Sequence, residues 1–225
     1  TIPKNRLKAF PGLEGSTYAS QLVIGKPLSI YKLYQLKGVN PETGLFEFED
    51  FNGDDIITGT ADRQFIADLT PGYYGSISNS IRYKNWNMDF LFQFVKKKGL
   101  NEFYNTEPPG IMFNQPASVL NHWQESGDQA TMQVYTTGWD YDAYEAYSRY
   151  AVSSGVVSDM SFIRLKSLYL SYKLPLEKPG FKNWVLYVQG QNLLTFTRFK
   201  GGDPEQLTGF LPPMRRISLG LKIEL

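Results

Sequence analysis

The chain carries several segments in which apolar and polar residues alternate one by one, the pattern of a β-strand with two unlike faces. The clearest is 216–225, RISLGLKIEL, whose apolar residues all fall on odd positions. Segments 73–83, 86–94, 164–174 and 184–194 also alternate, and 28–36 does so more weakly. The pattern predicts about six antiparallel strands of about 10 residues, close to the length that a tilted membrane strand needs.

The connections between these segments are short and long in turn. Lys84-Asn85 predicts a tight hairpin, and 175–183 is the other short link. The long connections are 38–71, 95–161 and 196–214. Such alternation is typical of an outer-membrane barrel, with short turns on one side and long loops on the other. Within 164–174 the apolar positions change phase after Leu165, which predicts a β-bulge.

Composition narrows the class of protein. Aromatic residues make up 15% of the 225 residues, which suits β structure and the aromatic girdles of membrane barrels. The net charge of +1 gives no electrostatic case for nucleic acid as a partner. The absence of cysteine excludes disulfides and thiol nucleophiles. Because the smallest membrane barrels need about eight strands, six strands imply a piece of something larger.

Several short motifs occur in a fixed order along the chain. They are GKPLSIY at 25–31, DFNGDDII at 50–57, TPGYYG at 70–75 with YKNW at 83–86, SFIRLK at 161–166 with LSYKLP at 170–175, GQNLLT at 190–195 and GDPE at 202–205. Together they resemble the C-terminal part of the SusC/RagA-type TonB-dependent outer-membrane transporters of Bacteroidetes. Two positions depart from that family: Asp55 stands where it usually has glycine, and Leu225 where barrels usually end in an aromatic residue.

The resemblance implies a fold and a function. Residues 1–225 would be the C-terminal portion of a 22-stranded transmembrane barrel, an all-β antiparallel segment with long extracellular loops. The N-terminal plug is absent from these residues. Such transporters reside in the outer membrane, import oligosaccharides or oligopeptides under a SusD-like lipoprotein lid, and draw energy from TonB through a part not present here. The bilayer would surround the barrel, and the chain would not be an enzyme.

The alternating strands assign residues to two environments. On the apolar face we expect lipid contact for Phe90, Phe92, Leu219 and Leu221. On the polar face we expect a place in the lumen for Asn87, Asp89, Gln93, Ser218 and Lys222. This division is the one that membrane β-strands show.

The loop at 50–57 is a candidate metal site. Asp50, Asn52 and Asp54 place oxygen ligands at positions 1, 3 and 5 of a calcium-type loop. Position 6 is Asp55 rather than glycine, and position 12 is Ala61 rather than glutamate, so a complete EF-hand is not predicted. The alternative is a solvated Asn-Gly turn. No other cofactor is expected.

Aromatic residues crowd the long connection at 135–150. Because aromatic rings stack on sugars and on peptide side chains, Trp139, Tyr141 and Tyr144 are candidate substrate contacts. The alternative is that these rings pack the loop or meet a lid protein. Carboxylate pairs such as Asp203 and Glu205 occur, but no catalytic set is assembled around them. The alternative function is that of a soluble β-sandwich carbohydrate-binding module.

Overall fold

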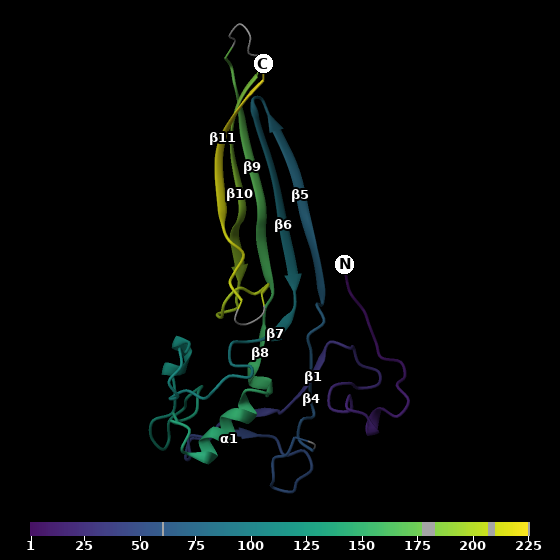
Figure 1. Ribbon diagram of the computed structural model, residues 1–225, viewed down its shortest axis with the longest axis vertical. Coiled ribbons are helices and arrows are strands. Elements are labelled where there is room, and N and C mark those ends of the chain that lie inside the picture. Colours follow the sequence, from purple (N-terminus) through teal and green to yellow (C-terminus); the bar gives the residue numbers. More distant parts are fainter. Residues whose placement is uncertain (60, 177–182, 207–209, 225) are drawn as a thin grey trace. The chain divides into compact units, whose positions relative to one another are not determined.

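The computed structural model describes residues 1–59, 61–176, 183–206 and 210–224, and it is mostly β with one short α-helix (Figure 1). These residues form two compact units. Unit 1 consists of Thr1–Pro3, Pro71–Lys97 and Asp159–Leu225, and unit 2 of Lys4–Thr70 and Lys98–Ser158. No helix in the described ranges is long and apolar enough to cross a membrane.

Unit 1 is a single five-stranded antiparallel sheet in the order β11-β10-β9-β6-β5. Its strands are β5 (Tyr73–Tyr83), β6 (Trp86–Lys96), β9 (Phe162–Leu174), β10 (Asn183–Thr197) and β11 (Arg216–Glu224). They correspond to the five clearest alternating segments, and they are longer than the five or six residues usual in soluble sheets.

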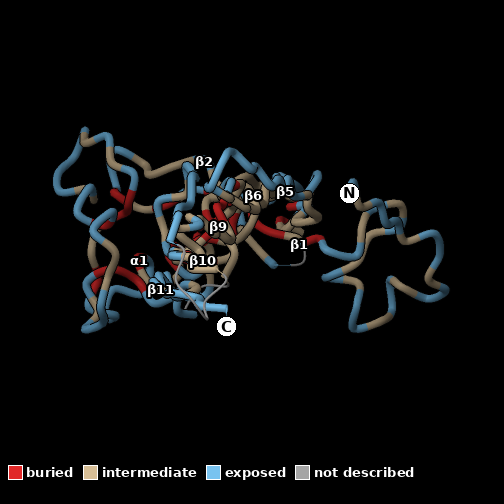
Figure 2. The backbone as a smooth tube through the Cα atoms, turned by 90° about the horizontal axis from the view of Figure 1, so that it is seen from above, coloured by how far each residue is buried: buried red, intermediate tan, exposed pale blue. Residues whose placement is uncertain are grey.

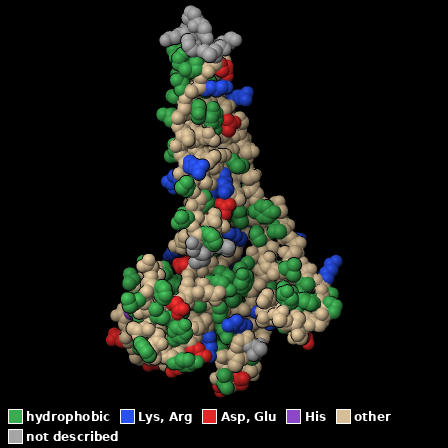
Figure 3. All heavy atoms as spheres, viewed as in Figure 1, with side chains coloured by type: hydrophobic (Ala, Val, Ile, Leu, Met, Phe, Trp, Pro, Cys, Tyr) green, Lys and Arg blue, Asp and Glu red, His purple; other side chains and the backbone are tan. Residues whose placement is uncertain are grey.

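The register brings like residues together across all five strands, because directly opposed residues share a face of the sheet. One row is polar and consists of Ser80, Asp89, Tyr169, Gln189 and Ser218. The neighbouring row, on the other face, is apolar and consists of Ile81, Met88, Leu170, Val188 and Leu219. Figure 3 shows hydrophobic side chains gathered along the sheet with charged ones between them.

The predicted hairpin and bulge are both present. β5 and β6 pair up to Tyr83 and Trp86, with Lys84 at φ 52° in the turn between them. Between β6 and β9 the register shifts at one point, because Leu91 opposes Ser167 whereas Phe92 opposes Leu165. Lys166 is therefore the extra residue of a β-bulge. The short link at 175–183 lies mostly outside the described residues.

The weak sixth segment does not form a barrel-length strand. It divides into β1 (Ile30–Leu33) and β2 (Leu36–Val39), which pair with β4 (Phe65–Asp68) and β3 (Phe46–Phe48). Tyr34 lies between them, buried, and forms an isolated bridge with Ser153. The described sheet therefore has five long strands, and the count of about six is not confirmed.

Unit 2 has its own hydrophobic core around α1 (Tyr141–Tyr150). The Asp140 side chain caps the helix by accepting a hydrogen bond from the Ala143 N–H at 3.1 Å. The Tyr150 ring stacks on Phe46 with centroids 4.1 Å apart. Figure 2 shows buried backbone at α1, whereas every residue of β11 except Gly220 is exposed. The remaining elements are β7 (Lys98–Leu100), β8 (Val157–Asp159) and the 3-10 turns Leu13–Gly15, Ala117–Leu120 and Ser154–Val156.

Candidate functional site

The two faces of the five-stranded sheet separate the residues as the alternation predicted. Asn87, Asp89, Gln93, Ser218 and Lys222 share the polar face. Phe90, Phe92, Leu219 and Leu221 share the apolar face.

Hydrogen bonds link side chains along the polar face. The Asn87 amide donates to Asp89 at 2.7 Å, and Arg82 Nε donates to Asn87 at 3.3 Å. The apolar face is open within its own unit, since Leu219 is 72% exposed. A soluble protein rarely exposes so continuous an apolar surface, so this face indicates a non-aqueous environment or a partner.

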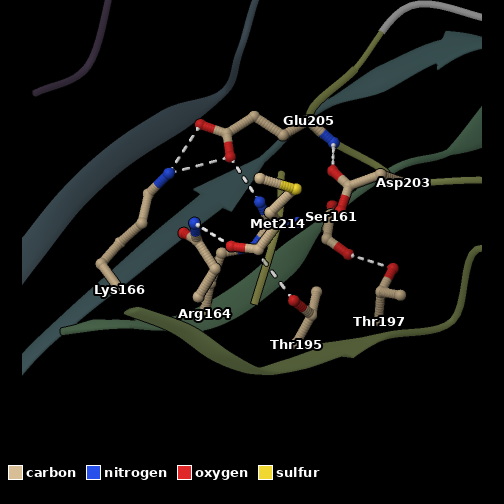
Figure 4. Close-up of polar contacts among 9 residues, drawn as sticks. Ser161, Arg164, Lys166, Thr195, Thr197, Asp203, Glu205 and Met214 are labelled. Atoms are coloured by element: carbon tan, nitrogen blue, oxygen red, sulfur yellow. Dashed lines mark hydrogen bonds and ion pairs between the residues drawn. The ribbon is translucent and has the colours of Figure 1, made fainter. Parts of the chain in front are cut away.

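A buried arginine organises the end of the polar face nearest the loop between β10 and β11 (Figure 4). Arg164 lies on β9, two residues before the bulge, and its side chain is 1% exposed. Its Nη2 atom is 2.5 Å from Asp203 and its Nη1 atom 2.6 Å from Glu205. Its Nε atom donates to Thr195 Oγ1 on β10 at 3.0 Å. Every nitrogen of the guanidinium therefore has an acceptor.

The bulge residue completes this cluster. Lys166 Nζ lies 2.9 and 3.1 Å from the two oxygens of Glu205. The Glu205 backbone N–H donates to Asp203 at 2.9 Å, which fixes the turn between the two carboxylates. We call Arg164, Lys166, Thr195, Asp203 and Glu205 the arginine cluster. It ties the long β10–β11 loop to the polar face of the sheet.

The electrostatics of the arginine cluster favour its ionised state. Burial raises the pKa of Asp203, but the hydrogen bonds from Arg164 and from the backbone outweigh burial and hold that pKa below its ordinary value. Lys97 lies close enough to these two carboxylates for its pKa to be affected. Burial lowers the pKa of Lys97, and the negative charges of Glu205 and Asp203 partly offset that change by raising it. Because both carboxylates are engaged by cations, the cluster is suited to fixing a loop rather than to acid–base catalysis.

The candidate substrate aromatics lie at the start of α1. Trp139 is 94% exposed and Tyr141 is 72% exposed, so both rings are available to a ligand. The Tyr144 hydroxyl donates to Glu107 at 3.3 Å, and the Glu107 charge raises the pKa of this tyrosine. The helix buries its other face, so its remaining tyrosines, Tyr147 and Tyr150, belong to the core.

The acidic loop is organised by its own backbone. Asp50 accepts hydrogen bonds from the N–H groups of Gly53 at 2.7 Å and Asp55 at 2.8 Å. Asp54 accepts from the Asn52 amide at 2.7 Å and from the Ile56 N–H at 2.9 Å. No group of three or more His, Asp or Glu side chains in the described part of the chain is arranged to hold a metal ion. Calcium bound by Asp50, Asn52 and Asp54 stays a prediction.

Sequence reasoning missed the arginine cluster as a unit. Its halves stood in two separate motifs, SFIRLK and GDPE, and Arg164 is separated by 39 residues from Asp203 and by 41 from Glu205. Both motifs belong to the ordered set that resembles the transporter family, and this was the available signal. No spacing rule joins residues so far apart in the chain.

Comparison with known proteins gives the family. No family model matches the chain. TonB-dependent receptor P3 of Formosa agariphila is 34% identical over 161 residues, which are 70% of this chain and 15% of that receptor. TonB-dependent receptor P26 of the same organism is 30% identical over 195 residues, 79% of this chain and 19% of that receptor. The chain belongs to the TonB-dependent receptors.

Solved structures support the fold of this TonB-dependent receptor chain. The RagAB peptide importer in its closed-closed state matches with a TM-score of 0.65 and 20% identity, covering 90% of this chain and 23% of that one. The RagAB peptide transporter matches with a TM-score of 0.61 and 24% identity, and the match covers 81% of this chain and 21% of that one. The chain spans 15–19% of the length of the curated relatives it matches. These relatives are receptors and transporters rather than enzymes, as the sequence predicted.

Proposed function

We propose that this chain forms part of the wall of a 22-stranded outer-membrane barrel that imports oligopeptides or oligosaccharides. The rest of the receptor supplies the remaining strands and the plug. A SusD-like lipoprotein covers the mouth, and TonB provides the energy through the plug-bearing part. The names of the curated relatives support receptor function, and RagAB, described as a peptide importer, supports oligopeptides as the first substrate class to test.

The observation that carries this proposal is the two-faced sheet. Its apolar face extends across all five antiparallel strands with exceptions such as Asn79, and its polar face does the same with exceptions such as Leu91 and Val185. Both edge strands, β5 and β11, pair on one side only among the described residues. Because a membrane sheet cannot leave edges unpaired, the proposal requires further strands on both sides.

The β-sandwich alternative lacks support. A sandwich needs a second sheet of comparable size over the apolar face. The other sheets in the described part of the chain have two strands each. The carbohydrate-binding module is therefore the weaker of the two readings.

Two contacts in the loops follow from the proposal. The exposed rings of Trp139 and Tyr141, together with Tyr144 on the first turn of α1, would stack on the incoming substrate or on the lid lipoprotein. Calcium at the acidic loop would add rigidity there, by replacing backbone N–H donors with a cation as the partner of Asp50 and Asp54.

Paired spin labels test the orientation of the sheet. The 225 residues contain no cysteine, so Leu219→Cys and Ser218→Cys each introduce one labelling site into this part of the intact receptor. In reconstituted bilayers, the nitroxide at 219 should relax faster with oxygen, which concentrates in lipid. The nitroxide at 218, its matched control on the other face, should respond to a water-soluble nickel chelate. Equal accessibility of both labels to the chelate would refute the proposal.

A further inference from the structure

A groove of about 590 Å³ opens on the apolar face of the sheet, at the end of the strands where the long loops attach. Its floor is a row of three side chains that oppose one another across the central strands: Phe94 on β6, Ile163 on β9 and Phe196 on β10. At this end β5 flanks the row, since Tyr73 opposes Lys96, whereas β11 pairs with β10 only as far as Gln191 and stops short of Phe196. Strands added at the sheet edges extend a sheet sideways and do not cover its face.

The floor is apolar and accessible. Ile163 is 49% exposed and Phe196 is 59% exposed. The Tyr73 ring borders Phe94, with centroids 6.3 Å apart. Gly75 makes room for the Phe94 ring, since a Cβ at Gly75 would lie 2.7 Å from that ring. The groove can therefore hold a flexible hydrocarbon segment against aromatic and branched side chains.

The rim of the same groove is polar and carries an excess of positive charge. Lys96 forms an ion pair with Asp159 at 2.7 Å, and Ser161 donates its hydroxyl to the same carboxylate. Arg198 also lines the rim, is exposed, and has no ion pair or hydrogen bond to any other described residue. Two cations thus face one carboxylate, and the guanidinium of Arg198 is free to bind an oxyanion.

We propose that this groove binds a lipid whose headgroup is a phosphate with net negative charge. The acyl chain would lie on Phe94, Ile163 and Phe196, and the phosphate would bind Arg198 with support from Lys96. The apolar floor matches the acyl chain of such a molecule, and the cationic rim matches its phosphate. Basic side chains at a membrane interface attract anionic headgroups. The inference rests on the proposed function, which places this face of the sheet in lipid.

Lipid retention by the intact receptor tests the groove. The receptor, purified in neutral detergent, is incubated with equal amounts of phosphatidic acid and phosphatidylcholine of the same acyl chains, and bound lipid is measured by native mass spectrometry. We expect phosphatidic acid to be retained in preference, and Arg198→Gln to lower its retention about fivefold, the effect of one interfacial cation. Lys84→Gln removes an exposed charge at the opposite end of the same sheet and should leave retention unchanged.

Several outcomes would overturn the inference. These are an equal retention of both lipids, an equal loss in Arg198→Gln and Lys84→Gln, or displacement of phosphatidic acid by millimolar inorganic phosphate alone. Phe196→Ser provides a second variant that keeps the charges and should also weaken retention. If these tests fail while the label at 219 still reports lipid, only the lipid site is wrong. If that label reports water, the proposed function itself fails.

Discussion

Replacing Arg164 by methionine should release the β10–β11 loop from the sheet. The side chain is 1% exposed and forms ion pairs with Asp203 and Glu205. Removing one partner of a buried ion pair costs about 3–5 kcal/mol, because the other charge is left without compensation. Glu205 is 29% exposed and partly solvated, so we expect the lower end, about 3 kcal/mol.

This penalty should appear as loop opening rather than as global unfolding. The carboxylates of Asp203 and Glu205 regain water only if the loop leaves the sheet. A change of about 3 kcal/mol raises the open population about 100-fold relative to the closed one. A nitroxide on Gly202→Cys reports this change, because a Cβ there meets no atom within 4 Å and the label does not disturb the loop. In the intact receptor its spectrum should gain a fast-moving component.

Two matched variants test whether Arg164 itself holds the loop. Lys200→Gln removes an exposed charge from the same loop and should leave the label immobile. Arg164→Lys keeps the charge but loses the forked geometry that reaches two carboxylates, so it should give intermediate mobility. If Arg164→Met leaves the spectrum of the wild type unchanged, the arginine cluster does not hold the loop. If Arg164→Met fails to assemble, Arg164→Lys carries the test.

Three further predictions follow from single sites. Phe92→Asp on the apolar face should cost up to about 2–4 kcal/mol of stability in lipid, whereas Leu91→Asp, its neighbour on the polar face, should cost less, as measured by denaturant titration in bilayers. Gly110→Ala, at φ +105°, would place a Cβ 2.5 Å from the backbone oxygen of Thr136. It should lower stability more than Gly127→Ala, at φ +95° in open space, where only backbone strain of about 1–2 kcal/mol is expected. Protease resistance of the loops measures the difference. Hydrogen bonds from Lys96 and Ser161 lower the pKa of Asp159 from 3.8 to about 2. The ion pair of Asp159 with Lys96 is therefore complete above pH 3.8 and is lost as the pH falls toward 2, with little change in stability because the pair is exposed. An infrared carboxylate band that Asp159→Asn abolishes should titrate near pH 2.

Much of the fold could be predicted because successive side chains of a β-strand point to opposite faces, so a strand between two environments alternates apolar and polar residues. The pattern identified all five strands of the large sheet, their two faces and the bulge near Leu165. The weak segment 28–36 failed for a local reason, since Tyr34 turns into the core of unit 2 and interrupts it. Alternation alone cannot tell a long strand from two short ones separated by two residues, here Tyr34 and Gln35.

The sites depended on contacts that no local pattern contains. The aromatic residues at 135–150 could not be ranked from the sequence, because their burial depends on where α1 begins and which face it buries. Trp139 precedes the helix and Tyr141 is its first residue, and both are exposed, whereas Tyr147 and Tyr150 lie on its buried face. Likewise, Asp203 and Glu205 looked like any pair of surface carboxylates. Their meaning depends on Arg164, which long-range pairing of β9 with β10 brings beneath their loop.

The β-bulge connects the polar and apolar sites of unit 1. In a regular strand, Arg164 would share a face with Leu168, and Ile163 would share one with Ser167. The extra residue Lys166 reverses this phase, so Ile163 joins the apolar row beside Phe94 while Arg164 turns to the polar face. The Lys166 side chain is itself used, since it binds Glu205. One inserted residue therefore places Ile163 in the floor of the groove on one side of the sheet and Arg164 in the arginine cluster on the other, and without it these two residues would exchange faces.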